Sequence, residues 1–166
     1  MDLKEQRAVI VRFSVRPDQG DPSGFDRGDM SWRGELGEAT SVGHVPDQGM
    51  MIWISLTDLL DSLHRLLTGR SGHVSFIGAD CSFSLTFRAT KRGVSVRGRS
   101  GPVARVGPAE LAVAVLSAAE ELASRHLSAV PLRDGVTHDY GSALDRFRLA
   151  ALEVAGPRPT PTGRQC

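Results

Sequence analysis

The segment from Cys81 to Arg99 predicts a β-hairpin, and this feature constrains the fold more than any other in the chain. Apolar residues alternate with polar ones on both sides of a turn at residues 91–93. The apolar positions are Phe83, Leu85, Phe87, Ala89, Val94 and Val96. A period of two residues is typical of strands with one buried face. The pattern therefore predicts an antiparallel sheet covered on one side, not a parallel sheet with helices on both faces.

Other periodic segments complete an α+β pattern. Strands are predicted over residues 8–16, 30–36, 40–45, 50–54, 72–78 and 103–106. Leucines at helical spacing follow Ser55, which forms an approximate capping box with Asp58, and they predict a helix that ends near Gly69. Two more helices are predicted over residues 108–127 and 140–155. We therefore expect one α+β domain over residues 1–156, with a mostly antiparallel twisted sheet, about three helices packed on one face, and a disordered Pro-rich tail at 157–166.

Composition excludes several function classes. The formal net charge is +1, which argues against a dominant field for nucleic acid or a membrane surface. No apolar stretch is long enough to span a bilayer, and the first residues lack the basic and apolar pattern of a secretory signal. We therefore expect a cytoplasmic protein without membrane contact. The two cysteines, Cys81 and Cys166, are too few for a disulfide framework, and no set of ligands at metal-binding spacing accompanies them, so no metal or cofactor is expected.

Charge is unevenly distributed along the chain. Residues 17–49 contain seven acidic side chains and two arginines, whereas residues 81–109 contain six basic side chains and no acidic one. The two segments either lie side by side and neutralise each other, or one of them binds a protein partner of opposite charge. The predicted partner-binding residues are Arg88, Lys91, Arg92, Arg97 and Arg99. A nucleic-acid partner is disfavoured, because Phe83 and Phe87 share the apolar face and leave no stacking platform on the basic one.

Two short sequences contain residue types that occur in catalytic sites. His138 precedes Asp139, and the two could act as an acid and a base, but Asp139 also suits the N-cap of the helix predicted at 140. Cys81 follows Asp80, and a neighbouring anion raises the pKa of a thiol and so opposes its activation. We assign no catalytic residue, and His138 and Asp139 are kept as weak candidates for a hydrolase-type enzyme.

Trp32 and Trp53 allow two interpretations. Both lie in apolar segments, where a tryptophan fills a core or lines a ligand pocket. The second interpretation makes the chain a small-molecule-binding domain with a pocket between the sheet and the helices. A homodimer is expected from the frequency of two-fold assemblies, through an exposed sheet edge or the alanine-rich helix at 108–127.

The order of elements over residues 50–127 supports a resemblance to known proteins. It runs from a strand to a leucine-rich helix (Ser55-Leu-Thr-Asp-Leu-Leu60), a hairpin (Phe83-Ser-Leu-Thr-Phe87, then Val94-Ser-Val96) and an Ala/Leu-rich helix (Glu110-Leu-Ala-Val-Ala-Val-Leu116). This layout resembles small uncharacterised actinobacterial α+β proteins and, more loosely, immunity proteins of bacterial polymorphic toxin systems. The resemblance implies a non-enzymatic domain that binds a protein partner, and no functional residue is carried over from it. The use of 18 arginines, two lysines and no asparagine fits a high-GC bacterium.

Overall fold

The computed structural model describes residues 8–156, which form eight strands and three α-helices. The strands are β1 (Ile10–Val15), β2 (Arg27–Gly34), β3 (Gly37–Thr40), β4 (Met50–Met51), β5 (His73–Ile77), β6 (Ser84–Thr90), β7 (Gly93–Gly98) and β8 (Gly101–Val106). The helices are α1 (Ile52–Leu67), α2 (Pro108–His126) and α3 (Val136–Ala155), and a short 3-10 helix, Leu127–Ala129, follows α2. The predicted α+β class, with antiparallel strands and three helices, is confirmed. The predicted tail at 157–166 and Cys166 lie outside the described residues.

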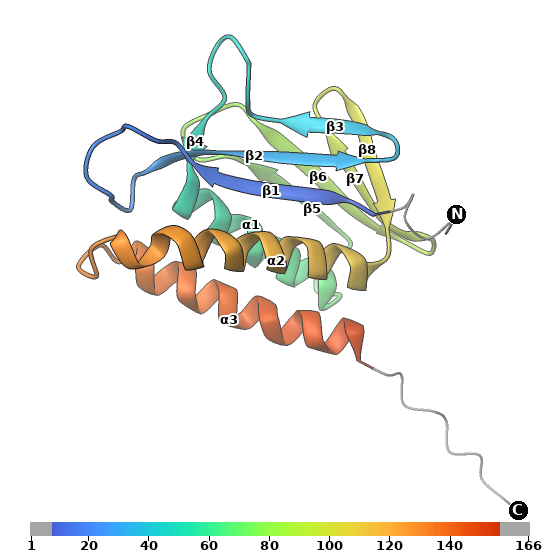
Figure 1. Cartoon of the computed structure of the whole chain (residues 1–166). Coiled ribbons are helices and arrows are strands. Elements are labelled where there is room, and N and C mark those ends of the chain that lie inside the picture. The colour runs from blue at the N-terminus through green and yellow to red at the C-terminus, as the bar shows by residue number, and fades with distance from the viewer. Residues whose placement is uncertain (1–7, 157–166) are drawn as a thin grey trace, which may run out of the picture.

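The strands are divided between two antiparallel sheets (Figure 1). Sheet A has the order β1-β2-β3, with β4 also paired to β2, and sheet B has the order β5-β6-β7-β8. The hairpin predicted at residues 81–99 is confirmed, since β6 pairs with β7 and Phe87 lies opposite Val96. The sheets meet where the turn between β2 and β3 reaches β8. There the backbone N–H of Leu36 donates a hydrogen bond of 3.0 Å to the carbonyl of Val103.

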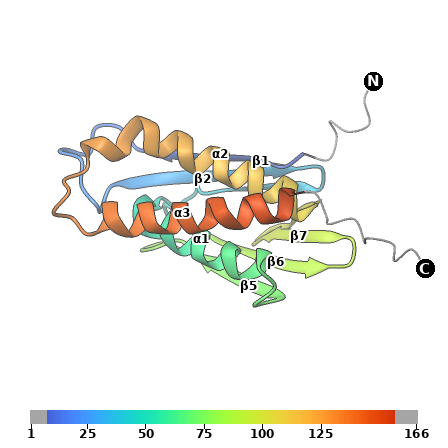
Figure 2. The same cartoon turned by 90° about the horizontal axis from the view of Figure 1, so that it is seen from below.

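The three helices cover one side of the two sheets, as predicted. Helix α2 packs on β1, α1 packs on β5, and α3 packs across both α1 and α2. Figure 2, seen from below, shows α3 between the other two helices, with the sheets behind them. This arrangement leaves the opposite face of sheet B away from the helices (Figure 1). The polar side chains of the hairpin lie on that face.

Two aromatic pairs join the layers of the core. Trp32 of β2 lies edge-on to Phe87 of β6, with ring centroids 5.4 Å apart, and so connects sheet A to sheet B. Trp53 of α1 lies edge-on to Tyr140 of α3, with centroids 5.1 Å apart, and so connects two helices. All four side chains are fully buried. Both tryptophans are therefore core residues, which favours the first of the two interpretations given to them above.

The start of α1 differs from the sequence prediction. The strand predicted at 50–54 is limited to Met50–Met51, and the helix begins at Ile52. Ser55 consequently lies inside the helix and is not its cap; its buried Oγ accepts a hydrogen bond of 2.8 Å from the backbone N–H of Ala79. The difference has a physical reason, because a continuous apolar run has no period that separates a buried strand from a buried helix.

Two other boundaries are shifted. Helix α3 begins at Val136 rather than near residue 140, so Asp139 lies in its first turn and is not its N-cap. Strand β3 covers Gly37–Thr40, earlier than the strand predicted at 40–45. Ser41, just after β3, is fully buried and donates a hydrogen bond of 2.7 Å to Asp29. Residues 41–49 form a loop.

Gly34 permits the close approach of the two sheets, and its replacement is expected to be destabilising. A Cβ at Gly34 would lie 2.5 Å from the Cβ of Ala104 and 2.5 Å from the carbonyl oxygen of Val103. Because one of these neighbours is backbone, it cannot turn away, and we expect Gly34→Ala to lower the free energy of unfolding by about 1–3 kcal/mol. Urea denaturation measures this loss. Gly72→Ala, which meets open space, is the control, and equal stability of the two variants would contradict the close contact.

Candidate functional site

The predicted partner-binding residues lie on the exposed face of sheet B and in the turns at the two ends of β7: Arg88 and Arg97 are on β6 and β7, Lys91 and Arg92 are in the turn before β7, and Arg99 is in the turn after it. In β6 and β7 the side chains alternate between the core and solvent, so Arg88 and Arg97 point away from the helices. Arg88 lies opposite Ser95, and Ser95 lies opposite Arg105 of β8, so that three neighbouring strands contribute arginines to one surface. We define the basic face as six exposed side chains: Arg88, Lys91, Arg92, Arg97, Arg99 and Arg105.

Arg105 was not among the predicted binding residues. Strand β8 contains a register shift relative to β7, between Val96 and Arg97, and Val103 and Ala104 are consecutive buried residues. A strict period of two therefore assigns the wrong face to part of this strand. The signal that could have identified Arg105 is its position within the acid-free segment at 81–109, which the charge count had already included.

The basic face has no acidic partner within the described residues. None of its six side chains takes part in an ion pair there. Between the arginines the surface presents small hydroxyl groups, among them Thr86 opposite Arg97 and Ser95 opposite Arg88. Like charges on one side of a sheet raise the local positive potential, which attracts an anionic surface.

The acidic segment at residues 17–49 does not neutralise the basic face. Arg16 pairs with Asp29 at 2.9 Å and with Asp47 at 2.6 Å. Arg27, inside the segment, pairs with Asp80 at 2.6 Å. Asp29 and Asp47 thus pair with Arg16 and not with the basic face, and no described acidic residue of the segment forms an ion pair with any of the six bases of that face.

The contacts of Arg16 lower the pKa of two carboxyl groups. Burial alone would raise the pKa of Asp29, but hydrogen bonds from Arg16 and Ser41 outweigh it and hold this pKa below its ordinary value. For exposed Asp47, hydrogen bonds from Arg16 and from the backbone N–H of Gly49 lower the pKa well below its usual range. The same two carboxylates raise the pKa of Arg16.

Stability is therefore expected to depend on pH through Arg16. Both carboxyl groups have a folded pKa below the ordinary value of 3.8, so their stabilisation is present above that value and is lost as the pH falls below it. Arg16→Met removes both ion pairs. The difference in unfolding free energy between the wild-type protein and this variant should shrink from about pH 7 to about pH 3, as measured by urea denaturation at each pH. Arg70→Met, at an exposed position, is the control, and a difference for Arg16→Met that stays constant with pH would contradict the account.

The two catalytic candidates, His138 and Asp139, do not form a common site with Tyr140, the next residue along the chain. His138 and Asp139 are exposed, with side chains 85% and 70% accessible and 3.6 Å between the His138 Nδ1 and the Asp139 Oδ1. Tyr140 instead points into the core, where its hydroxyl donates a hydrogen bond of 2.7 Å to the carbonyl of Ala119 and burial raises its pKa. The half-buried Cys81 is a free thiol, and burial raises its pKa, which opposes nucleophilic reactivity.

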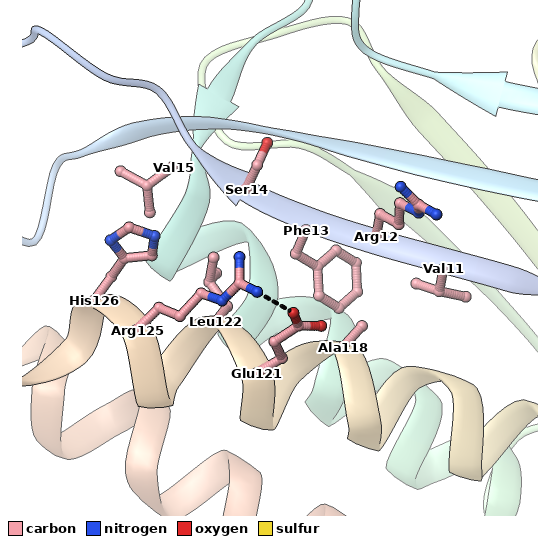
Figure 3. A pocket seen from close by; sticks show the side chains of 10 residues that line it. All are labelled: Val11, Arg12, Phe13, Ser14, Val15, Ala118, Glu121, Leu122, Arg125 and His126. Atoms are coloured by element: carbon pink, nitrogen blue, oxygen red, sulfur yellow. Dashed lines mark ion pairs between the residues drawn. The ribbon is translucent and has the colours of Figure 1, made fainter.

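A groove of about 600 Å³ lies between β1 and α2 (Figure 3). Val11, Phe13 and Val15 of β1 face α2 across it, and an ion pair of 2.8 Å between Glu121 and Arg125 lies along the helical side. This groove lies between a strand of sheet A and a helix, and Trp32 and Trp53 are not among its lining residues.

A polar cavity of about 450 Å³ adjoins the basic face at Arg99. Its wall includes the hydroxyl-bearing side chains Ser82, Ser84 and Ser100 beside the Arg99 guanidinium, with Glu38 and His44 on the side of sheet A. His44 is held by a contact of 2.8 Å between its Nε2 and the carbonyl of Thr40. A guanidinium with neighbouring hydroxyl donors suits a carboxylate.

Comparisons with known proteins do not assign the chain to a family: no protein-family model, curated protein or solved structure matches it. In residues 8–156, no helix is long and apolar enough to cross a membrane. The same residues contain no group of three or more His, Cys, Asp or Glu side chains suited to hold a metal ion.

Proposed function

We propose that this chain is a non-enzymatic interaction domain that binds an acidic protein partner through the basic face. The observation that carries the proposal is a set of six exposed basic side chains, three on the strands of sheet B and three in the turns before and after β7, with no acidic residue in the segment that supplies them. Within the described residues none of these six side chains forms an ion pair. An acidic protein surface supplies the missing carboxylates and is attracted over a distance, which speeds association.

A protein partner fits the basic face better than a nucleic acid does. The three phenylalanines of this region, Phe76, Phe83 and Phe87, are buried, so none of them is available for base stacking, and His73 is the one exposed ring on the strands of sheet B. The hydroxyl groups of Thr86 and Ser95 suit hydrogen bonding with carboxylate and amide groups. The cavity at Arg99 gives an acidic side chain of the partner a place to enter.

The resemblance to immunity proteins suggests the class of this partner. In the immunity-like form of the proposal, the partner is a bacterial toxin that presents an acidic surface, and the basic face covers that surface. The acidic segment at 17–49 is the less suitable binding surface, because Asp29 and Asp47 are already paired with Arg16. Buried Trp32 and Trp53 do not support a ligand pocket of the kind first considered for them.

Affinity purification tests the class of partner. The tagged full-length chain is incubated with nuclease-treated lysate of the organism that produces it, at low and at high salt, and bound proteins are identified by mass spectrometry. The proposal predicts an acidic protein that is retained at low salt, released at high salt and insensitive to nuclease. Recovery that depends on intact nucleic acid, or a partner unaffected by salt, would contradict it.

A further inference from the structure

Strand β1 is an open edge of sheet A. The backbone N–H of Arg16 donates to the carbonyl of Arg27 at 2.9 Å, and this pair continues the register of β1 with β2. Because bonded positions alternate in an antiparallel ladder, the backbone groups of Val11, Phe13 and Val15 point away from β2. Among residues 8–156, no strand pairs with that side of β1.

The same three residues provide an apolar surface beside the open edge. Val11, Phe13 and Val15 are only half-buried, and their side chains line the groove along α2 (Figure 3). The groove is continued by a second cavity, of about 580 Å³, where the side chain of Val113 is 55% exposed. Strand β1 contains no proline or bulge of the kind that protects free edges, and its one charged residue is Arg12, whose side chain lies on the other face of the strand from Phe13.

We infer that two copies of this chain pair through β1, in antiparallel orientation about a two-fold axis at Phe13. This register places Phe13 opposite Phe13 of the second copy and Val11 opposite its Val15. In this register the outward-pointing backbone groups of Val11, Phe13 and Val15 are all hydrogen-bonded to β1 of the second copy. A two-fold axis at any other residue of β1 would leave at least one of the three without a partner in that strand. On the opposite face Arg12 meets Ser14 of the second copy, so equal charges are not directly opposed. The self-complementary stripe is the reason for choosing a second copy as the occupant.

Strand β5 is also an edge but lacks these features. The hydrogen bond from Ala89 to the carbonyl of Gly72 sets the ladder so that His73, Ser75 and Ile77 point their backbone groups outward. Their side chains lie on the solvent face of sheet B and line neither of the two cavities along α2. Ser75 therefore provides a matched control position on a second open edge.

Disulfide crosslinking tests both the pairing and its register. In full-length protein carrying Cys81→Ala and Cys166→Ala, Phe13→Cys is expected to form a crosslinked dimer under mild oxidation, because opposite Cα atoms about 5.5 Å apart are within disulfide reach. Val11→Cys and Val15→Cys should each remain uncrosslinked alone and should crosslink when mixed. Ser75→Cys should remain monomeric in the same assay. Since the mixed pair keeps Phe13, it tests the register even if Phe13→Cys folds poorly.

Sedimentation equilibrium of the unmodified chain completes the test. We expect a concentration-dependent dimer that Val11→Lys converts to a monomer and that Arg88→Glu with Arg97→Glu leaves intact, so this result is independent of the basic face. A monomer at every concentration, crosslinking through Ser75→Cys, or self-crosslinking of Val11→Cys would overturn the inference. If the chain is monomeric while Val11→Lys abolishes binding of another protein, the edge accepts an extended segment of that protein, and the second copy is the wrong occupant.

Discussion

Trp32→Ala is expected to lower the free energy of unfolding by about 3–5 kcal/mol, a large part of the stability of an ordinary domain. Trp32 is fully buried and its ring meets Phe87 of the other sheet, so the substitution removes an aromatic contact between sheets A and B. The surrounding strands cannot collapse onto the vacated volume without breaking their ladders. Urea denaturation followed by circular dichroism measures the loss.

Trp32→Phe is the matched control for this prediction. Within the described residues the Nε1 of buried Trp32 has no hydrogen-bond partner, so phenylalanine removes an unsatisfied polar group while it keeps an aromatic ring against Phe87. We therefore expect a smaller loss for Trp32→Phe than for Trp32→Ala. Equal losses, or a loss below about 1 kcal/mol for alanine, would show that Trp32 does not join the two sheets.

Reversing two charges of the basic face is expected to slow partner association by about tenfold or more at low salt. Arg88→Glu and Arg97→Glu alter diagonal neighbours on β6 and β7, and both side chains are exposed, so the fold should tolerate the change. The reversed charges repel an acidic surface and also remove favourable long-range attraction. Stopped-flow or biosensor kinetics with the purified partner measure the association rate, and its salt dependence should flatten in parallel.

Arg70→Glu with Arg133→Glu provides a control of equal charge change. Both arginines are exposed and lie outside sheet B. If net charge alone governed association, the two double variants would behave alike. If the partner binds the basic face, only the double variant at Arg88 and Arg97 should show a strongly reduced association rate. Similar association rates for the two double variants would contradict binding at the basic face.

Local periodicity predicts most of the individual elements of this fold. The alternation around Phe87 and Val96 identifies the hairpin, because a half-buried strand must change its environment at every residue. The leucines of α1 and the small apolar residues of α2 likewise identify buried helical stripes. Local periodicity does not predict how the strands pair into two sheets, since strand pairing depends on contacts between residues that are distant in the sequence. Nothing local in residues 27–34 indicates that β2 also pairs with Met50–Met51.

The same distinction applies to the candidate site. Exposure of Arg88 and Arg97 follows from strand alternation and could be predicted. The partners of Asp29 and Asp47 could not, because they depend on Arg16 reaching both carboxylates in the folded chain. The burial of Tyr140 away from His138 is similarly a consequence of where α3 begins.

The most direct test of the basic face as a binding surface is an NMR titration of the arginine side-chain Nε–Hε signals with the purified partner. The proposal predicts that the signals of Arg88, Arg97 and Arg105 shift on binding, while those of the exposed Arg70 and Arg133 stay in place. Shifts confined to Arg70 and Arg133, or to arginines of sheet A such as Arg16, would contradict the proposal and place the partner elsewhere on the molecule.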